Sequence, residues 1–317
     1  MSTAGRGGLP EQVRLVEVGL RDGLQAIETP MPTSAKVEVV HALVGSGVRE
    51  IEAVSFAHPK VLPQLADAEE VMAKVPRIDG VTYRGLVPNL RGARRASDCG
   101  LDEMVLVVSA DEAVSLRNQR RTVAQMLDEI PAVAEVAAAS GARFIVGVAC
   151  AFFAPARGPV PVAEADVVVD AAAAAGAVGV YLAGTSGMEH PGEFAGGVER
   201  VRTRHPGLEV GVHLHDRNGF AMANAVAAMT AGASWLEASF AGLGGDMWFP
   251  GDPTVLGNAA TEDLVHLCES MGIRTGISMS AYLEVVEMVV QLTGRASTSH
   301  VTRGGTRSEL AAASWPE

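Results

Sequence analysis

Two closely spaced histidines are the clearest chemical signal in the sequence. His213 and His215 end a β-branched stretch and are followed directly by Asp216. Side chains two residues apart on a strand point to the same side, so both imidazoles would face one point. Such a pair could hold a divalent cation, or it could be two hydrogen-bonded histidines with a structural role. The spacing leaves both interpretations open, and we favour the metal site.

An arginine and a carboxylate stand together near the start of the chain. Arg21 and Asp22 follow the strand-like stretch 14–18, and Gln25 comes three residues later. A carboxylate added to two imidazoles and an amide oxygen suits a cation such as Mn²⁺ or Mg²⁺. Because the pattern contains no thiolate, the sequence does not favour a soft metal.

A glycine-rich segment, 241–246, follows the last strand-like stretch and ends in Gly244, Gly245 and Asp246. Glycine allows a loop to move or to approach a ligand closely, although such segments are often ordinary turns. The position after a strand favours a functional interpretation.

The elements that would position these residues alternate between apolar β-branched stretches and helical patterns. Eight such pairs predict an α/β fold, a (β/α)8 TIM barrel, whose active site is built at the C-terminal ends of the strands. A doubly wound sheet is less favoured because no G-x-G-x-x-G pattern follows the first strand. The expected strands are 14–18, 50–54, 81–87, 103–108, 143–149, 179–183, 209–213 and 234–238. The expected helices are 34–45, 64–74, 90–99, 123–140, 162–176, 192–205, 219–232 and 260–271.

The remaining segments are short. We expect a flexible N-terminal leader at 1–12, the barrel domain with a C-terminal helical appendage (281–292) at 13–295, and a polar tail at 296–317. The leader has no apolar core of the kind that a signal peptide carries. The longest uncharged apolar run, 171–184, is shorter than the roughly 20 residues needed to cross a bilayer.

Composition narrows the classes of partner. The 317 residues carry 25 Lys and Arg against 37 Asp and Glu, a formal charge of −12. Such a surface disfavours nucleic acid and anionic membranes, so we expect a small-molecule substrate, with no nucleic-acid or membrane partner. The three cysteines, Cys99, Cys150 and Cys268, suggest neither a disulfide framework nor a zinc site and fit a reducing, cytoplasmic location. A homodimer is the expected assembly.

Taken in order, the motifs of the chain resemble those of one enzyme family. Six segments are similar in order and spacing to 3-hydroxy-3-methylglutaryl-CoA lyase, a metal-dependent lyase on a TIM barrel. These segments are 17–25, 54–60, 87–90, 212–216, 241–245 and 257–264.

The resemblance implies a complete set of ligands and a reaction. A divalent cation, Mg²⁺ or Mn²⁺, would be held by Asp22, His213, His215 and Asn258. Arg21 would stabilise the enolate that forms when a carbon–carbon bond breaks, and Glu52 and Glu262 match further acidic positions near the site, of which we take Glu52 as catalytic. We expect substrate contacts at Gln25, Gly244 and Gly245.

Two positions depart from the family pattern. The family has a catalytic cysteine directly after its Gly-Gly pair, where this chain has Asp246, and the loop from there to Asn258 is longer by about three residues. The family also has an aspartate of its acyl-binding site where this chain has Gly184. We hypothesise that Asp246 partly takes over both groups as a catalytic acid, although it could equally be a solvated loop residue. Trp248 and Phe249 could reshape the pocket or pack within the loop.

The sequence therefore predicts a carbon–carbon lyase that performs retro-aldol or retro-Claisen cleavage of a 3-hydroxyacyl-CoA or related hydroxy acid. With hydroxymethylglutaryl-CoA the products would be acetyl-CoA and acetoacetate. The alternatives are a 2-oxo-acid aldolase or acyl-transferring synthase of the same barrel superfamily, and a catalytically retired barrel that binds a metal.

Overall fold

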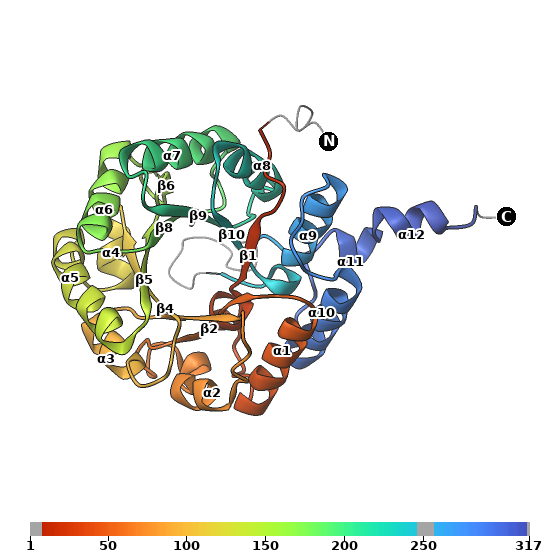
Figure 1. The fold of residues 1–317 in the computed structure, drawn as a ribbon, viewed down its shortest axis with the longest axis horizontal. Coiled ribbons are helices and arrows are strands. Elements are labelled where there is room, and N and C mark those ends of the chain that lie inside the picture. Colours follow the sequence, from red (N-terminus) through yellow and green to blue (C-terminus); the bar gives the residue numbers. More distant parts are fainter. Residues whose placement is uncertain (1–7, 246–256, 316–317) are drawn as a thin grey trace.

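The backbone forms a closed barrel of parallel strands surrounded by helices (Figure 1). The computed structural model describes residues 8–245 and 257–315. Around the barrel the described strands follow the order β1-β10-β9-β8-β5-β4-β3-β2, and β1 pairs with both β10 and β2 to close the ring. The barrel strands are β1 (Arg14–Glu17), β2 (Glu50–Ser55), β3 (Thr82–Leu86), β4 (Glu103–Ser109), β5 (Arg143–Ala149), β8 (Gly179–Gly184), β9 (Glu209–Leu214) and β10 (Trp235–Ala238).

Helices cover the outside of this barrel, as a parallel sheet buried on both faces requires. They are α1 (Thr33–Gly45), α2 (Ala68–Lys74), α3 (Leu90–Ala96), α4 (Glu112–Asn118), α5 (Val123–Ser140), α6 (Val162–Ala174), α7 (Pro191–Arg204), α8 (Ala221–Ala231) and α9 (Thr261–Ser270). The C-terminal helices α10 (Met279–Thr293), α11 (Val301–Gly304) and α12 (Arg307–Ala312) follow α9 on one side, where α12 projects from the body (Figure 1).

Side chains alternate between the two faces of each strand. Val16 and Val18 point into the barrel, where they pack in one buried cluster with Trp235 from the neighbouring strand β10 and Tyr181 from β8. Leu15, by contrast, belongs to the larger core between barrel and helices. The interior is therefore filled with side chains, and ligands can reach only its ends.

Glycines on neighbouring strands leave room for the large aromatic rings inside the barrel. A Cβ at Gly211 would lie 2.1 Å from Cε2 of Trp235, and a Cβ at Gly147 would lie 2.2 Å from Cζ of Tyr181. Both distances are far below van der Waals contact, so each ring occupies the volume that a neighbouring side chain would fill.

The predicted barrel is confirmed, and the predicted strand bounds agree with the structure to within one residue at every end. Sequence periodicity missed the short elements: α4, the hairpin of β6 (Phe153–Ala154) and β7 (Gly158–Pro159), and the two helices in the predicted tail. These elements span one to two turns or two residues per strand, too few for a period to emerge.

Parts of the predicted leader and of the predicted tail form hydrogen bonds with the barrel domain. The N–H of Arg274 donates to the carbonyl of Glu11 (2.9 Å), inside the predicted leader. In the predicted tail, Asp263 accepts hydrogen bonds from the N–H groups of His300 (2.8 Å) and Val301 (2.9 Å). Among the described helices none combines the length and apolarity needed to span a bilayer.

The tight packing of Trp235 gives a testable consequence. Gly211→Ala places a methyl group inside the ring, so we expect a loss of about 1–3 kcal/mol in the free energy of unfolding. Gly196→Ala is the matched control, because Gly196 is exposed on α7 and a Cβ there would have no atom within 4 Å beyond its own helix backbone. We expect that variant to gain about 0.5–1 kcal/mol through helix propensity. Urea unfolding measures both, and an unchanged midpoint for Gly211→Ala would contradict the tight packing of Trp235 against Gly211.

Candidate active site and metal centre

The chain leaves β1 in a single π-helical turn, Gly19–Gly23, that presents Arg21 and Asp22 at the C-terminal mouth of the barrel. The carbonyl of Val18 accepts the N–H groups of Arg21 (3.0 Å) and Asp22 (2.7 Å). π-Helical turns are uncommon and occur often at functional sites, because they change the direction of side chains relative to an α-helix. Both side chains are buried.

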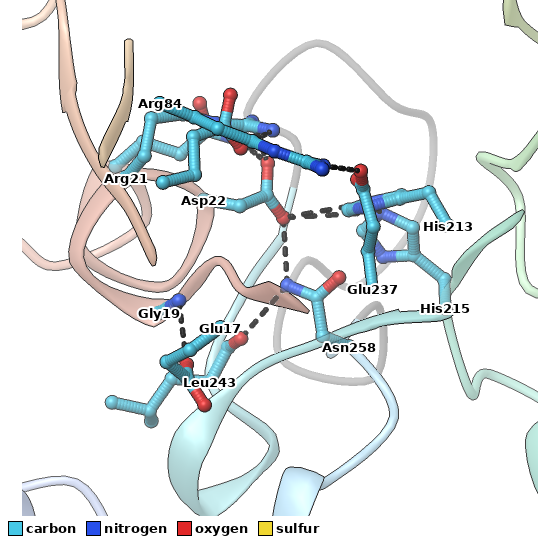
Figure 2. Close-up of polar contacts among 12 residues, drawn as sticks. Glu17, Gly19, Arg21, Asp22, Arg84, His213, His215, Glu237, Leu243 and Asn258 are labelled. Atoms are coloured by element: carbon cyan, nitrogen blue, oxygen red, sulfur yellow. Dashed lines mark hydrogen bonds and ion pairs between the residues drawn. The ribbon is translucent and has the colours of Figure 1, made fainter. Parts of the chain in front are cut away.

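Asp22, His213 and His215 converge at this mouth from opposite sides (Figure 2). The Nε2 atoms of the two histidines lie 3.1 Å apart. Each Nε2 atom lies 3.9 Å from Oδ2 of Asp22. Two nitrogen atoms and a carboxylate oxygen at these separations surround a point that a small divalent cation could occupy.

Asn258 completes this group and provides the test of whether a cation fits. Its Nδ2 donates to Oδ2 of Asp22 (2.6 Å) and to the carbonyl of Leu243 (2.9 Å). Its Oδ1 is buried and has no hydrogen-bond partner among the described residues. A buried, unpaired amide oxygen is unfavourable unless a ligand satisfies it, so the donor set fits a cation bound by two imidazoles and two oxygens.

Arg21 is held beside Asp22 by a second carboxylate. Its Nε and Nη2 atoms lie 2.8 Å and 2.7 Å from Oε2 of Glu52, and its Nη1 contacts Oδ1 of Asp22. Burial alone would raise the pKa of Asp22, but Arg21, the two histidines and Asn258 outweigh it and lower the pKa to about 2. Asp22 is therefore a carboxylate at neutral pH, as a metal ligand must be.

The pKa of Glu52 is shifted in the opposite direction from that of Asp22. Burial raises its pKa, and the nearby Glu237 and Asp22 add to this effect, while Arg21 opposes it. Its Oε1 atom is buried and unpaired among the described residues. One oxygen of Glu52 thus orients Arg21, and the other is free to exchange a proton.

The structure brings the predicted substrate-binding residues to the same place. Gln25 Nε2 donates to Oδ1 of Asp22 (2.8 Å) and to the carbonyl of Gly245 (3.3 Å). Gly244, at φ +156°, lies so close to Asn258 that a Cβ there would be 2.3 Å from Nδ2. Gly244 therefore allows Asn258 to reach Asp22, a steric role that the sequence did not indicate. Asp246, Trp248 and Phe249 lie outside the described residues.

Sequence reasoning missed Glu237, which contacts His213 from below. Its Oε2 lies 3.1 Å from Nδ1 of His213. The signal was present, since Glu237 is a charged residue within the apolar strand Trp-Leu-Glu-Ala and shares the inner face with Trp235.

A buried carboxylate also lies beside Gly184, where the sequence pointed to a missing one. A Cβ at Gly184 would lie 3.0 Å from Oε2 of Glu189, a buried side chain that accepts a hydrogen bond from the hydroxyl of Ser186 (2.8 Å). Glu189 comes five residues later in the chain, so only the return of the loop brings it there.

Two further carboxylates are buried between the barrel and the helices on the β1 side. Glu17 accepts hydrogen bonds from the N–H groups of Gly19 (2.8 Å) and Phe240 (2.9 Å) and from the hydroxyl of Thr261 (2.8 Å). Glu262 accepts from the N–H of Ala241 (3.2 Å). They tie the turn after β1, the segment after β10 and α9 together beneath the mouth.

Comparison with known proteins shows the family to which this chain belongs. A family model described as HMGL-like matches residues 12–289. The mitochondrial hydroxymethylglutaryl-CoA lyase of Arabidopsis thaliana is 36% identical over 92% of this chain, which spans 62% of that protein's length. The corresponding mouse protein is 33% identical, with 96% of this chain and 92% of that protein covered. An HMG-CoA lyase structure from Acinetobacter baumannii, in complex with coenzyme A and 3-methylmalate, superposes with a TM-score of 0.90 at 33% identity, covering 96% of this chain and 98% of the other.

The fold and the mouth thus define a (β/α)8-barrel protein with a candidate metal centre at the C-terminal ends of its strands. The chain belongs to the HMGL-like family. The resemblance read from the six motifs is confirmed, and so is the prediction of a carbon–carbon lyase at the level of this family.

The buried carboxylates beneath the mouth predict a pH dependence of stability. Burial raises the pKa of Glu17 to about 7 and that of Glu262 to about 8, both from 4.5. A carboxyl group whose pKa is raised by folding stabilises the fold fully below its unfolded pKa, and this contribution is lost as the pH rises through the folded pKa. For Glu262 the loss between pH 4.5 and 8 is of order 4 kcal/mol.

We therefore expect thermal stability to fall between pH 5 and pH 8, and to fall less in Glu262→Gln. Glu269→Gln, an exposed glutamate on the same helix, is the control and should follow the wild type. Differential scanning calorimetry across this range measures the three curves. Parallel curves for wild type and Glu262→Gln would rule out a protonated Glu262 in the folded state.

Proposed function

We propose that this chain is a divalent-metal-dependent lyase that cleaves a carbon–carbon bond of a 3-hydroxyacyl-CoA, with hydroxymethylglutaryl-CoA as the first substrate to test. The observation that carries the proposal is the convergence of Asp22, His213, His215 and the unpaired amide oxygen of Asn258 beside a buried arginine. Names of relatives 33–36% identical to this chain support the same substrate.

The four ligand side chains would hold Mg²⁺ or Mn²⁺, since carboxylate and amide oxygens suit both ions and imidazole nitrogens favour Mn²⁺. When bound, the ion would polarise substrate oxygens and favour negative charge that develops on them. The buried position of these side chains keeps water away and strengthens each electrostatic contact.

Arg21 supplies a fixed positive charge for the enolate. In the cleavage, a base removes the proton of the 3-hydroxyl group, the C2–C3 bond breaks, and its electron pair moves onto C2 and the thioester carbonyl. The products are a ketone at C3 and an acetyl-CoA enolate that takes a proton at C2. Because Glu52 and Asp22 already orient the guanidinium, its donors need little reorganisation when charge develops.

Two residues are candidates for the general acid or base of the reaction. Glu52 has an oxygen with no partner among the described residues, beside Arg21, and burial raises its pKa, so it suits a role as general acid or base. Asp246 stands in the sequence where the family's loop cysteine is expected, and it would deliver a proton from the loop.

Coenzyme A is the proposed carrier of the acyl group. The A. baumannii relative binds coenzyme A, and this chain covers nearly all of it. The expectations of a homodimer and of a cytoplasmic location stay predictions, and light scattering during gel filtration measures the first.

The decisive measurement is cleavage of hydroxymethylglutaryl-CoA with Mg²⁺ or Mn²⁺, with acetoacetate and acetyl-CoA followed as products. We expect His213→Ala to lose both Mn²⁺ binding and turnover, whereas Arg21→Gln keeps Mn²⁺ binding and loses about 10²- to 10³-fold in kcat. His205→Ala is the control, because His205 pairs with Asp170 at the end of α7, away from the mouth.

The outcomes separate the alternatives. Mn²⁺ binding without turnover would move the search to other hydroxyacyl-CoA thioesters and to 2-oxo acids, and a lack of turnover on all of these would indicate a retired barrel. Failure of the wild type to bind either ion would contradict the metal centre itself.

A separate pair of variants tests Asp246. Asp246→Asn removes the acid while keeping the size of the side chain, so we expect kcat to fall about 10²- to 10⁴-fold. Asp246→Cys restores the group expected from the family and should keep more activity than Asp246→Asn. Equal turnover in wild type and Asp246→Asn would show that Asp246 is a solvated loop residue.

A further inference from the structure

A chain of buried charges runs inside the barrel beneath the metal centre. Arg84, on β3, is 1% exposed. Its Nη2 lies 2.7 Å from Oε2 of Glu50, its Nη1 lies 3.2 Å from Oε1 of Glu237, and its Nε contacts Glu103. Figure 2 shows the guanidinium pointing across the barrel at Glu237.

This charge is unexpected where it lies. Arg84 shares the barrel interior with the apolar cluster that contains Trp235, and its guanidinium carbon is 5.0 Å from the centre of that ring. Buried ion pairs contribute little net stability, and apolar side chains of similar volume often serve a fold as well. The network therefore calls for a role other than stability.

The contacts of Glu237 indicate that role. Its Oε1 accepts from Nη1 of Arg84 (3.2 Å) and from Nε1 of Trp235 (2.9 Å). Its Oε2 is left for Nδ1 of His213, at 3.1 Å. Because Arg84 and Trp235 fix the orientation of the carboxylate through Oε1, Oε2 is directed at Nδ1 of His213.

We propose that Glu237 is the positioning residue of His213, and that Arg84 and Trp235 hold Glu237 in place. A carboxylate at Nδ1 keeps a proton on that nitrogen, so Nε2 presents its lone pair towards Asp22 and His215. The affinity of the mouth for a divalent cation then depends on an arginine at the other side of the barrel interior. The inference rests on the metal centre of the proposed function, and it does not require the lyase reaction.

Mn²⁺ affinity, measured by titration calorimetry without substrate, tests the role of Glu237. Glu237→Gln keeps the shape of the side chain and removes its charge, and we expect the Kd for Mn²⁺ to rise about 10- to 100-fold. Arg84→Lys should weaken binding in the same direction and by less, because a lysine ammonium cannot reproduce all the contacts of the guanidinium. Asp111→Asn is the matched control: Asp111 is also buried and paired with an arginine, Arg157 (3.0 Å), and its variant should bind Mn²⁺ as the wild type does.

A purely structural role would give a different pattern. It would lower the melting temperature of Glu237→Gln and leave the Kd of the folded protein unchanged, and that result would overturn the proposal. If Glu237→Gln does not fold, the Mn²⁺ affinity of Arg84→Lys and an NMR measurement on the wild type test the proposal instead.

In the wild type, NMR of ¹⁵N-histidine-labelled protein without added metal reports the proton directly, with His213→Gln used for assignment. We expect a slowly exchanging hydrogen on Nδ1 of His213. An Nδ1 atom without a hydrogen would overturn the proposal even if the lyase assay succeeds. Loss of lyase activity with the expected Nδ1 hydrogen and Mn²⁺ affinities would instead contradict the proposed substrate alone.

Discussion

The hydrogen bond between Nδ2 of Asn258 and Oδ2 of Asp22 joins residues 236 positions apart, and the rest of the site depends on it. It can form only when β1 pairs with β10 and closes the barrel, because Asp22 follows the first barrel strand and Asn258 the last. The two polar atoms of the amide, Nδ2 and Oδ1, have different roles. Its nitrogen donates to Asp22 and Leu243, which leaves its oxygen without a partner among the described residues.

Closure of the barrel also concentrates charge in a place that would otherwise be apolar. Arg21, Asp22 and Glu52 are buried at the mouth, and Arg84, Glu50, Glu103 and Glu237 are buried beneath them. Burial would penalise each of these groups by several kcal/mol if it stood alone. Each arginine therefore lies between carboxylates, and the carboxylate nearest the histidines, Glu237, has a lowered pKa despite its burial because His213 and Arg84 contact it.

The large rings inside the barrel set the depth of the site. Trp235 and Tyr181 fill the interior beside Gly211 and Gly147. Their side chains therefore close the barrel below the mouth. Tyr181 lies with its ring centre 5.8 Å from that of His213, which places an aromatic side chain beside a candidate metal ligand. The proposed substrate would therefore lie in the loops above the strands, where Gln25, Gly244 and Gly245 are found.

The sequence by itself determined the barrel, because each strand and helix is long enough for its period to show and parallel strands buried on both faces are continuously apolar. It also predicted that His213 and His215 face the same point, since residues two apart on a strand must face the same way. Arg21 and Asp22, by contrast, are presented by the π-helical turn after β1. The contacts of Glu237 with His213, of Glu189 beside Gly184, and of Gly244 with Asn258 were decided only by the tertiary structure. These contacts depend on strand register, on loop return and on which side chain fills the space left by a glycine, and no local period in the chain encodes them.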